Sequence, residues 1–151
     1  MAHTLHALGL ALALTVGACN LPAADKESDA AAQRLYTELR TGADLAADPA
    51  LGAELKTPDA IAQLAEIRPH LPVGAPGKVT RRSWKYNVDT NGSWAELTHA
   101  YDYPNGTVIA DSVLHKAPGQ KAWQVVGFHV KVEPNAPGAA KPAAPIPGQK
   151  T

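Results

Sequence analysis

Apolar and polar residues alternate with a period of two in four runs downstream of Gly77. The runs span residues 79–88, 93–103, 107–116 and 122–132. Alternation of this kind is typical of strands that bury one face. Asn-Gly stands at the first two junctions, at 91–92 and 105–106, and this dipeptide is the strongest short signal for a β-hairpin. The pattern therefore predicts four strands, joined in chain order into an antiparallel meander.

Upstream of these runs, apolar residues recur at helical spacing. A first helix is predicted over residues 29–42, with Ser28 or Asp29 as its N-cap and Gly42 at its end. Its apolar stripe consists of Ala32, Leu35, Tyr36 and Leu39.

A second helix is predicted from Pro58, because Thr57 can cap it and proline is favoured at the first helical position. Pro69 ends this helix, and residues 47–58 indicate one or two short turns before it. Helices followed by a meander make an α+β fold, in which N-terminal helices pack on one face of a four-stranded antiparallel sheet.

Short hairpin loops set a register and divide the sheet into two faces. The face predicted to lie under the helices is mostly apolar: Trp84, Tyr86, Val88, Ala95, Leu97, His99, Tyr101, Val108, Ala110, Ser112, Leu114, Val126, Phe128 and Val130. The other face carries Arg81, Lys85, Glu96, Asp102, Asp111, His115, His129 and Lys131, with Trp94 and Trp123 among them. A slip of one residue exchanges the faces of a strand, so these assignments depend on the register.

This order of elements resembles the cystatin-like and nuclear transport factor 2-like folds over residues 29–133, in which a curved sheet wraps a helix. The last run, AWQVVGFHVKV (122–132), is similar to the closing strand of many small bacterial lipoproteins of that kind. The resemblance implies a fold and leaves the function open, because known members include enzymes, ligand binders and scaffolds.

The first segment is an uncharged apolar run, ALGLALALTVGA at 7–18, which ends at the only cysteine of the chain, Cys19. As a helix this run spans about 18 Å, less than the hydrocarbon core of about 30 Å. Its length is typical of a secretory signal peptide. Residues 16–19, VGAC, resemble the lipobox of bacterial lipoproteins.

The lipobox resemblance implies that residues 1–18 are a signal peptide and that Cys19 becomes an N-terminus carrying diacylglyceryl and palmitate-like chains. An Asp after the cysteine is the family's usual signal for retention in the inner membrane, so Asn20 favours the outer membrane. The preceding MAHTLH lacks Lys and Arg, which departs from the pattern. The alternative is a buried N-terminal helix with an inert core cysteine.

Two stretches are predicted not to fold. Residues 19–28 are expected to form a tether between the anchor and the domain. Residues 134–151 are rich in Pro, Ala and Gly and cannot bury enough apolar surface to offset their ordering entropy, so they are expected to form a disordered tail.

Composition excludes several classes of function. The 14 Lys and Arg balance the 14 Asp and Glu, which argues against a nucleic-acid binder. A single cysteine excludes an internal disulfide and a Cys-based zinc site. The chain has no GxSxG, HExxH, P-loop or GxGxxG motif, and no cofactor is predicted.

His99 is the strongest candidate for chemistry. In the predicted register it lies on the apolar face beside Arg82 or Trp84 and Ser112. A histidine with an arginine in a pocket of the sheet can bind an anion or move a proton. The simpler interpretation is a core histidine whose ring nitrogens are hydrogen-bonded to neighbours.

The outer face offers weaker candidates. Asp111, His115 and His129, with Asp102, can form a metal site or an acid–base pair if the strands align them, or ordinary cross-strand pairs. Trp94 and Trp123 can mark a partner surface or a sugar-stacking platform. The connector at 72–77 or the tail can equally cover these two side chains.

The sequence thus predicts a lipid-anchored protein on the periplasmic side of a bacterial envelope. Its domain is expected to bind an envelope protein or a small ligand. One alternative is a small enzyme that uses His99 with Arg82 or Ser112, and another is a purely structural envelope component.

Overall fold

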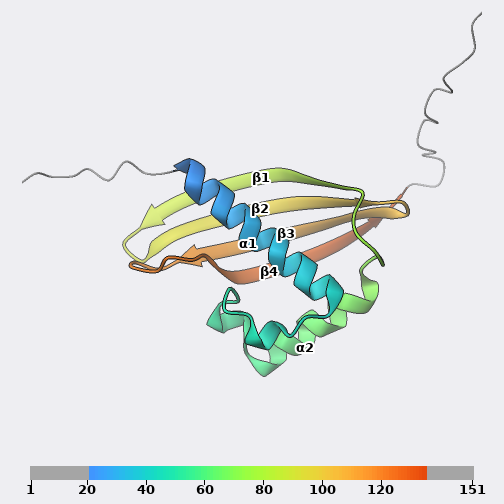
Figure 1. The fold of residues 1–151 in the computed structure, drawn as a ribbon, viewed down its shortest axis with the longest axis horizontal. Helices are drawn as coiled ribbons and strands as arrows, with labels where there is room; N and C mark the ends of the chain where they lie inside the picture. Colours follow the sequence, from blue (N-terminus) through green and yellow to red (C-terminus); the bar gives the residue numbers. More distant parts are fainter. Residues whose placement is uncertain (1–20, 136–151) are drawn as a thin grey trace, which may run out of the picture.

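A computed structural model describes residues 21–135 of the chain. Its helices are α1 (Leu21–Thr41), which crosses one face of the sheet, and α2 (Pro58–Ile67), which lies beyond β4 (Figure 1). The strands are β1 (Lys78–Asp89), β2 (Gly92–Tyr103), β3 (Gly106–Lys116) and β4 (Gln124–Pro134). They neighbour one another in chain order, so the predicted α+β fold with an antiparallel meander is confirmed. Cys19 lies outside the described residues, as does the predicted tail of residues 134–151 except for its first two residues. Pro134 is the last residue of β4, so the strand reaches into the stretch predicted to be tail.

Helix α1 begins at Leu21, ahead of the start predicted at residue 29, so most of the predicted tether is helical. Contacts with the sheet hold this part of the helix: Asp25 pairs with Arg81, and Ser28 is buried and accepts a hydrogen bond from Trp84. Ser28 and Asp29 therefore lie inside the helix, where the local pattern predicts an N-cap. Tertiary contacts account for the early start of α1, because the partners of these side chains lie on β1 and β2.

The predicted apolar stripe of α1 is buried against the sheet. The ring of Tyr36 stacks on Tyr101 of β2 with a centroid separation of 3.7 Å. Its hydroxyl shares a hydrogen bond of 2.8 Å with the hydroxyl of Tyr103. Burial, and then this hydrogen bond, raise the pKa of Tyr36 well above its usual range. These contacts position α1 across the middle of the sheet.

Helix α2 follows the predicted local signals. Thr57 is its N-cap and accepts a hydrogen bond of 3.3 Å from the backbone N–H of Ala60, and Pro58 lies in the first turn. The helix ends at Ile67, and a 3-10 turn that contains Pro69 follows it. The 3-10 turn at Ala53–Leu55 lies within the stretch 47–58 where the sequence predicts short turns, and another at Leu45–Ala47 lies ahead of it.

Both Asn-Gly sites lie in tight hairpins, as predicted, with loops at 90–91 and 104–105. Gly92 has a φ of +130°, and a Cβ atom added there would lie 2.3 Å from the carbonyl oxygen of Lys116. Only glycine avoids both the strain and the clash at this position.

Two irregularities change the predicted faces. In β1 the register shifts between Arg81 and Ser83, which leaves Arg82 without a partner in the register and brings Arg81 opposite His99 on the covered face. In β4 the pairing passes from Gly127 to Val125, so Val125 is buried where the strict alternation predicts Val126. A bulge adds one residue to a strand, and a period of two does not reveal it.

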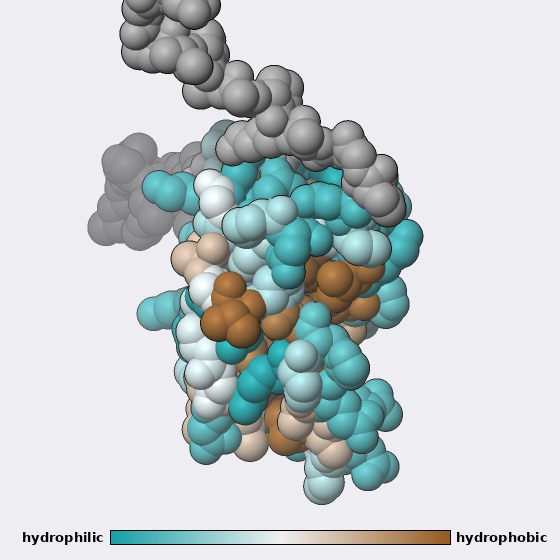
Figure 2. All heavy atoms as spheres, turned by 90° about the vertical axis from the view of Figure 1, so that its right-hand side faces the viewer, coloured by the Kyte–Doolittle hydropathy of each residue, from teal (hydrophilic) through white to brown (hydrophobic). Residues whose placement is uncertain are grey.

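The two edges of the sheet differ. At β4, the N–H of Gly52 donates to the carbonyl of Val125 and the N–H of Val125 donates to the carbonyl of Ala50, each at 2.8 Å, so a loop pairs with this edge. The outer edge of β1 has no strand partner among residues 21–135. The end of the molecule that carries the β2–β3 hairpin shows its apolar side chains in small separate areas among polar ones (Figure 2).

Candidate functional site

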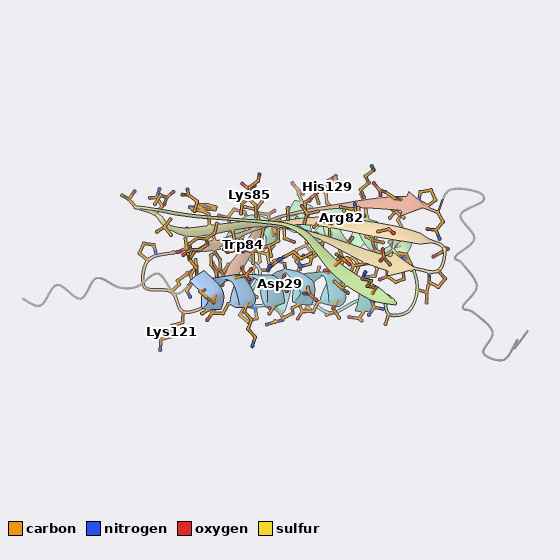
Figure 3. All side chains as sticks on the ribbon, turned by 90° about the horizontal axis from the view of Figure 1, so that it is seen from above. Asp29, Arg82, Trp84, Lys85, Lys121 and His129 are labelled. Atoms are coloured by element: carbon orange, nitrogen blue, oxygen red, sulfur yellow. The ribbon has the colours of Figure 1, made fainter. Side chains whose placement is uncertain are left out.

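His99 lies on β2 beneath α1, and its side chain is 1% exposed. Its Nε2 atom is 2.9 Å from Oδ1 of Asp29, which α1 points toward the sheet (Figure 3). Arg81, opposite His99 on β1, donates to the carboxylates of both Asp25 and Asp29. The covered face thus holds one cluster of Asp25, Asp29, Arg81 and His99, which joins the first half of α1 to β1 and β2.

Two polar atoms in this cluster's surroundings are buried without a hydrogen-bond partner within the described residues. They are Nδ1 of His99 and the hydroxyl of Tyr101, whose ring centroid is 6.1 Å from that of His99. Burial, followed by the negative charge of Asp29, raises the pKa of Tyr101 well above its usual range. The hydrogen bond to Asp25 is the main cause that raises the pKa of Arg81, which therefore stays a cation.

The acidic side chains of the cluster and Arg81 are open to solvent, whereas His99 is not. A hollow of about 450 Å³ between α1 and β1 is lined by Asp25, Asp29, Arg81, Lys26, Gln33 and Val79. His99 is not in this lining, and its ring is sealed by the helix. The arrangement can fasten α1 to the sheet, and it offers no path for a substrate to the imidazole.

The structure does not assemble the predicted set of His99, Arg82 and Ser112. Arg82 is exposed and lies at the bulge of β1, where it has no partner in the register with β2. Ser112 is buried on β3 opposite Leu97, and no hydrogen bond joins it to His99. The bulge is the physical reason, because it puts Arg81 where the predicted register places Arg82.

Sequence reasoning missed the acidic partners of His99. Asp25 and Asp29 are four residues apart, a spacing that places both on one face of a helix. This spacing is informative only if the helix extends upstream to Asp25, and the sequence predicts a tether there.

The proposed metal ligands are not gathered at one point. Asp111 and His129 face each other across β3 and β4 with 3.8 Å between Oδ2 and Nδ1, and Thr98 also donates to Asp111. His115 lies elsewhere on the outer face, where it stacks on Trp94 at a centroid distance of 4.1 Å. Within residues 21–135 no group of three or more His, Cys, Asp or Glu side chains is arranged to hold a metal ion.

The two tryptophans do not form a shared platform. Trp94 lies half-buried on the outer face, as predicted, beside His115. Trp123 is 3% exposed and belongs to the core on the covered face, so its predicted exposure is wrong. It precedes the bulge of β4, packs edge-on against Tyr86 at 6.3 Å and lines a hollow of about 360 Å³ with several alanines of α1 and its surroundings.

The free edge of β1 is the longest unpaired backbone in the described sheet. The strand has 12 residues, most of them exposed, and its pairing with β2 is continuous from Ser83 to Asp89. Its charged side chains are four basic residues and one acidic residue: Lys78, Arg81, Arg82, Lys85 and Asp89. Unpaired N–H and C=O groups of such an edge can accept an additional strand.

No protein family, curated protein or solved structure matches the chain. The likeness to cystatin-like and nuclear transport factor 2-like folds therefore remains a prediction from the order of the elements. No helix within residues 21–135 is long and apolar enough to span a membrane.

Proposed function

We propose that the protein is a lipoprotein of a bacterial envelope, anchored through acylated Cys19, and that its domain is a binding module. The module takes an extended segment of a partner protein along the free edge of β1. The observation that carries the binding role is that no strand within residues 21–135 pairs with this edge anywhere along its length, whereas on the opposite edge a loop pairs with β4 at Val125.

The anchor is supported by the sequence alone. The apolar run at 7–18, the small residues before Cys19 and the absence of any other cysteine fit a lipid attachment point. Two or three acyl chains hold a protein on a membrane far more firmly than one.

The charges of β1 favour one kind of partner. A second copy of β1 would bring its basic residues close to those of the first, which is unfavourable. An extended segment that carries Asp or Glu would instead oppose them with the complementary sign. The bulge at Arg82 distorts part of the edge and so disfavours indiscriminate pairing. The regular stretch from Ser83 to Asp89 is left for a specific partner.

The buried state of His99 supports a binding role over the enzyme alternative. A general acid or base must come within hydrogen-bond reach of the substrate atom whose proton it transfers. His99 is covered by α1, and its Nε2 atom is occupied by Asp29.

The anchor is tested with the full-length protein and its Cys19→Ala variant, expressed in a bacterium with a lipoprotein pathway. We expect the mature wild-type protein to gain the mass of acyl chains on Cys19 and to fractionate with membranes, while the variant does neither. A wild-type protein without added acyl mass contradicts the proposal.

The binding edge is tested by photo-crosslinking in the same cells. A benzophenone amino acid replaces Asn87 on β1 or, as a control, His129 on the outer face of β4, both of which are exposed. Adducts to one envelope protein are expected from position 87 and not from 129, and mass spectrometry should map them to an acidic segment. Equal adducts from both positions reject the edge.

A charge-reversal pair sharpens this test. Lys85 pairs with Glu96 on β2, and Lys131 pairs with Glu133 on β4, and all four side chains are exposed. Lys85→Glu should reduce the adduct yield, while Lys131→Glu should leave it unchanged. If both variants behave alike, charge on β1 does not select the partner.

A further inference from the structure

One end of the molecule gathers the start of α1, the β1–β2 hairpin and the β3–β4 connection (Figure 1). Lys116, at the end of β3, joins Glu27 of α1 at 3.3 Å, and Nε2 of His115 on β3 lies 3.0 Å from the backbone carbonyl oxygen of Asn91 in the β1–β2 hairpin, so these segments are in contact. We call this end, formed by residues 21–27, 88–92 and 116–122, the anchor end. The β2–β3 hairpin and the end of β4 lie at the opposite end (Figure 1).

We propose that the anchor end rests on the membrane surface, so that the strands stand up from the bilayer. The inference rests on the proposed acylation of Cys19. Only Asn20 separates Cys19 from the first residue of α1. Because consecutive Cα atoms are about 3.8 Å apart, the acylated residue lies within about 8 Å of Leu21.

The early start of α1 is what brings the anchor end close to the membrane surface. A flexible tether over residues 19–28 would let the domain move away from the lipid headgroups. Residues 21–28 are instead helical, and the ion pair of Asp25 with Arg81 and the burial of Ser28 hold them to the sheet. The anchor therefore acts on a segment that moves together with the domain.

The side chains of the anchor end suit a phospholipid surface. Leu21 and Val88 are exposed apolar residues, at 45% and 55%. Lys26 and Lys121 are exposed cations, and Lys121 points away from the domain at this end (Figure 3). The same end holds three carboxylates: Asp25 pairs with Arg81, Glu27 pairs with Lys116, and Asp89 accepts a hydrogen bond from the backbone N–H of Asn91. Apolar side chains can enter the headgroup region while lysines meet lipid phosphates. Because the lipid anchor holds this end of the domain next to the bilayer, the ligand of these side chains is the bilayer surface rather than free phosphate.

This orientation leaves the proposed binding edge accessible. Strand β1 runs from the far end to the anchor end (Figure 1). In this orientation the strand is roughly parallel to the bilayer normal, and its free edge faces the solvent beside the domain. A partner segment would reach it from the side, without displacing lipid.

The proposed contact of the anchor end with the membrane is tested by Förster resonance energy transfer on the acylated full-length protein. The protein is placed in vesicles of phosphatidylethanolamine and phosphatidylglycerol that carry a headgroup-linked acceptor dye. The thiol of Cys19 is consumed by the lipid, so a second cysteine can be labelled uniquely. Gln120→Cys labels the anchor end, and Asn105→Cys labels the far hairpin; both positions are exposed polar residues in turns.

Transfer from position 120 should be at least about threefold more efficient than from 105, because a strand of this length separates the two ends by about 40 Å. Inserting a Gly/Ser spacer between Asn20 and Leu21 should reduce that difference without changing acylation. If the protein is acylated and bound to vesicles but transfer is equal from both positions, the proposed orientation on the membrane is wrong and the proposed acylation stands. If the protein carries no acyl mass, both proposals are wrong.

Discussion

Each face of the sheet carries an Asp–His pair, and the two pairs lie in different surroundings. On the covered face, Asp29 meets His99 at 2.9 Å, and the histidine side chain is 1% exposed. On the outer face, Asp111 meets His129 at 3.8 Å, with side chains that are 53% and 75% exposed. The residue types are the same, but the two pairs differ in burial, in separation and in the second donor of the aspartate, which is Arg81 for Asp29 and Thr98 for Asp111. A buried pair is costly to break because its remaining member loses both partner and water, whereas an exposed pair contributes little.

The largest contrast is expected for apolar side chains. Leu97 on the covered face is 2% exposed, and Val113 on the outer face is 37% exposed. Leu97→Ala should lower the free energy of unfolding by about 3 kcal/mol, because it leaves a cavity in the core. Val113→Ala should lower it by about 0.5 kcal/mol. Urea unfolding of both variants measures the difference, and similar losses would contradict the assignment of the two faces.

The Asp–His pairs should differ by a smaller amount. Asp29→Ala should lower the free energy of unfolding by about 1–3 kcal/mol, since it leaves the buried His99 without its hydrogen-bond partner. Asp111→Ala should change it by less than about 0.5 kcal/mol. Double-mutant cycles with His99→Ala and His129→Ala separate each pair's coupling from other effects. Coupling of equal size in the two cycles would show that burial does not distinguish them.

The smallest effect is expected from the Tyr101 hydroxyl, and it concerns the dependence of stability on pH. The folded-state pKa of Tyr101 is raised above the value near 10 of an unfolded chain, mainly by burial. This contribution to stability is therefore complete below pH 10 and is lost as the pH rises above it, because the unfolded chain then releases a proton that the folded chain keeps. Tyr101→Phe should make the alkaline loss of stability shallower.

At neutral pH the same variant should cost little, because the Tyr101 hydroxyl has no hydrogen-bond partner within the described residues. Stability curves from pH 8 to 11 for the wild type and Tyr101→Phe make the test. An unchanged slope in the variant would mean that Tyr101 does not contribute to the alkaline transition.

The candidate cluster was predictable only in part. The apolar surroundings of His99 follow from the alternation of β2, and its burial matches the simpler interpretation of a core histidine. Its partner was wrong in the prediction, which placed Arg82 where the structure has Arg81. The acidic members, Asp25 and Asp29, were missed because the contacts that extend α1 upstream are made with distant strands.

The sequence by itself determined the elements whose signals are local. The period of two, the Asn-Gly turns and the Thr57 cap with Pro58 act within a few residues, so they specify the four strands, their hairpins and the start of α2. Backbone geometry and turn chemistry are sufficient for these features.

Only the tertiary structure decided where α1 begins, which residues bulge and where a loop pairs with the edge of β4. Each depends on pairs far apart in the chain: Asp25 with Arg81, Asp29 with His99, and Val125 with the loop at 50–52. A bulge at Arg82 or Val126 shifts every side chain beyond it to the other face, and only the balance of contacts across the whole sheet sets its position.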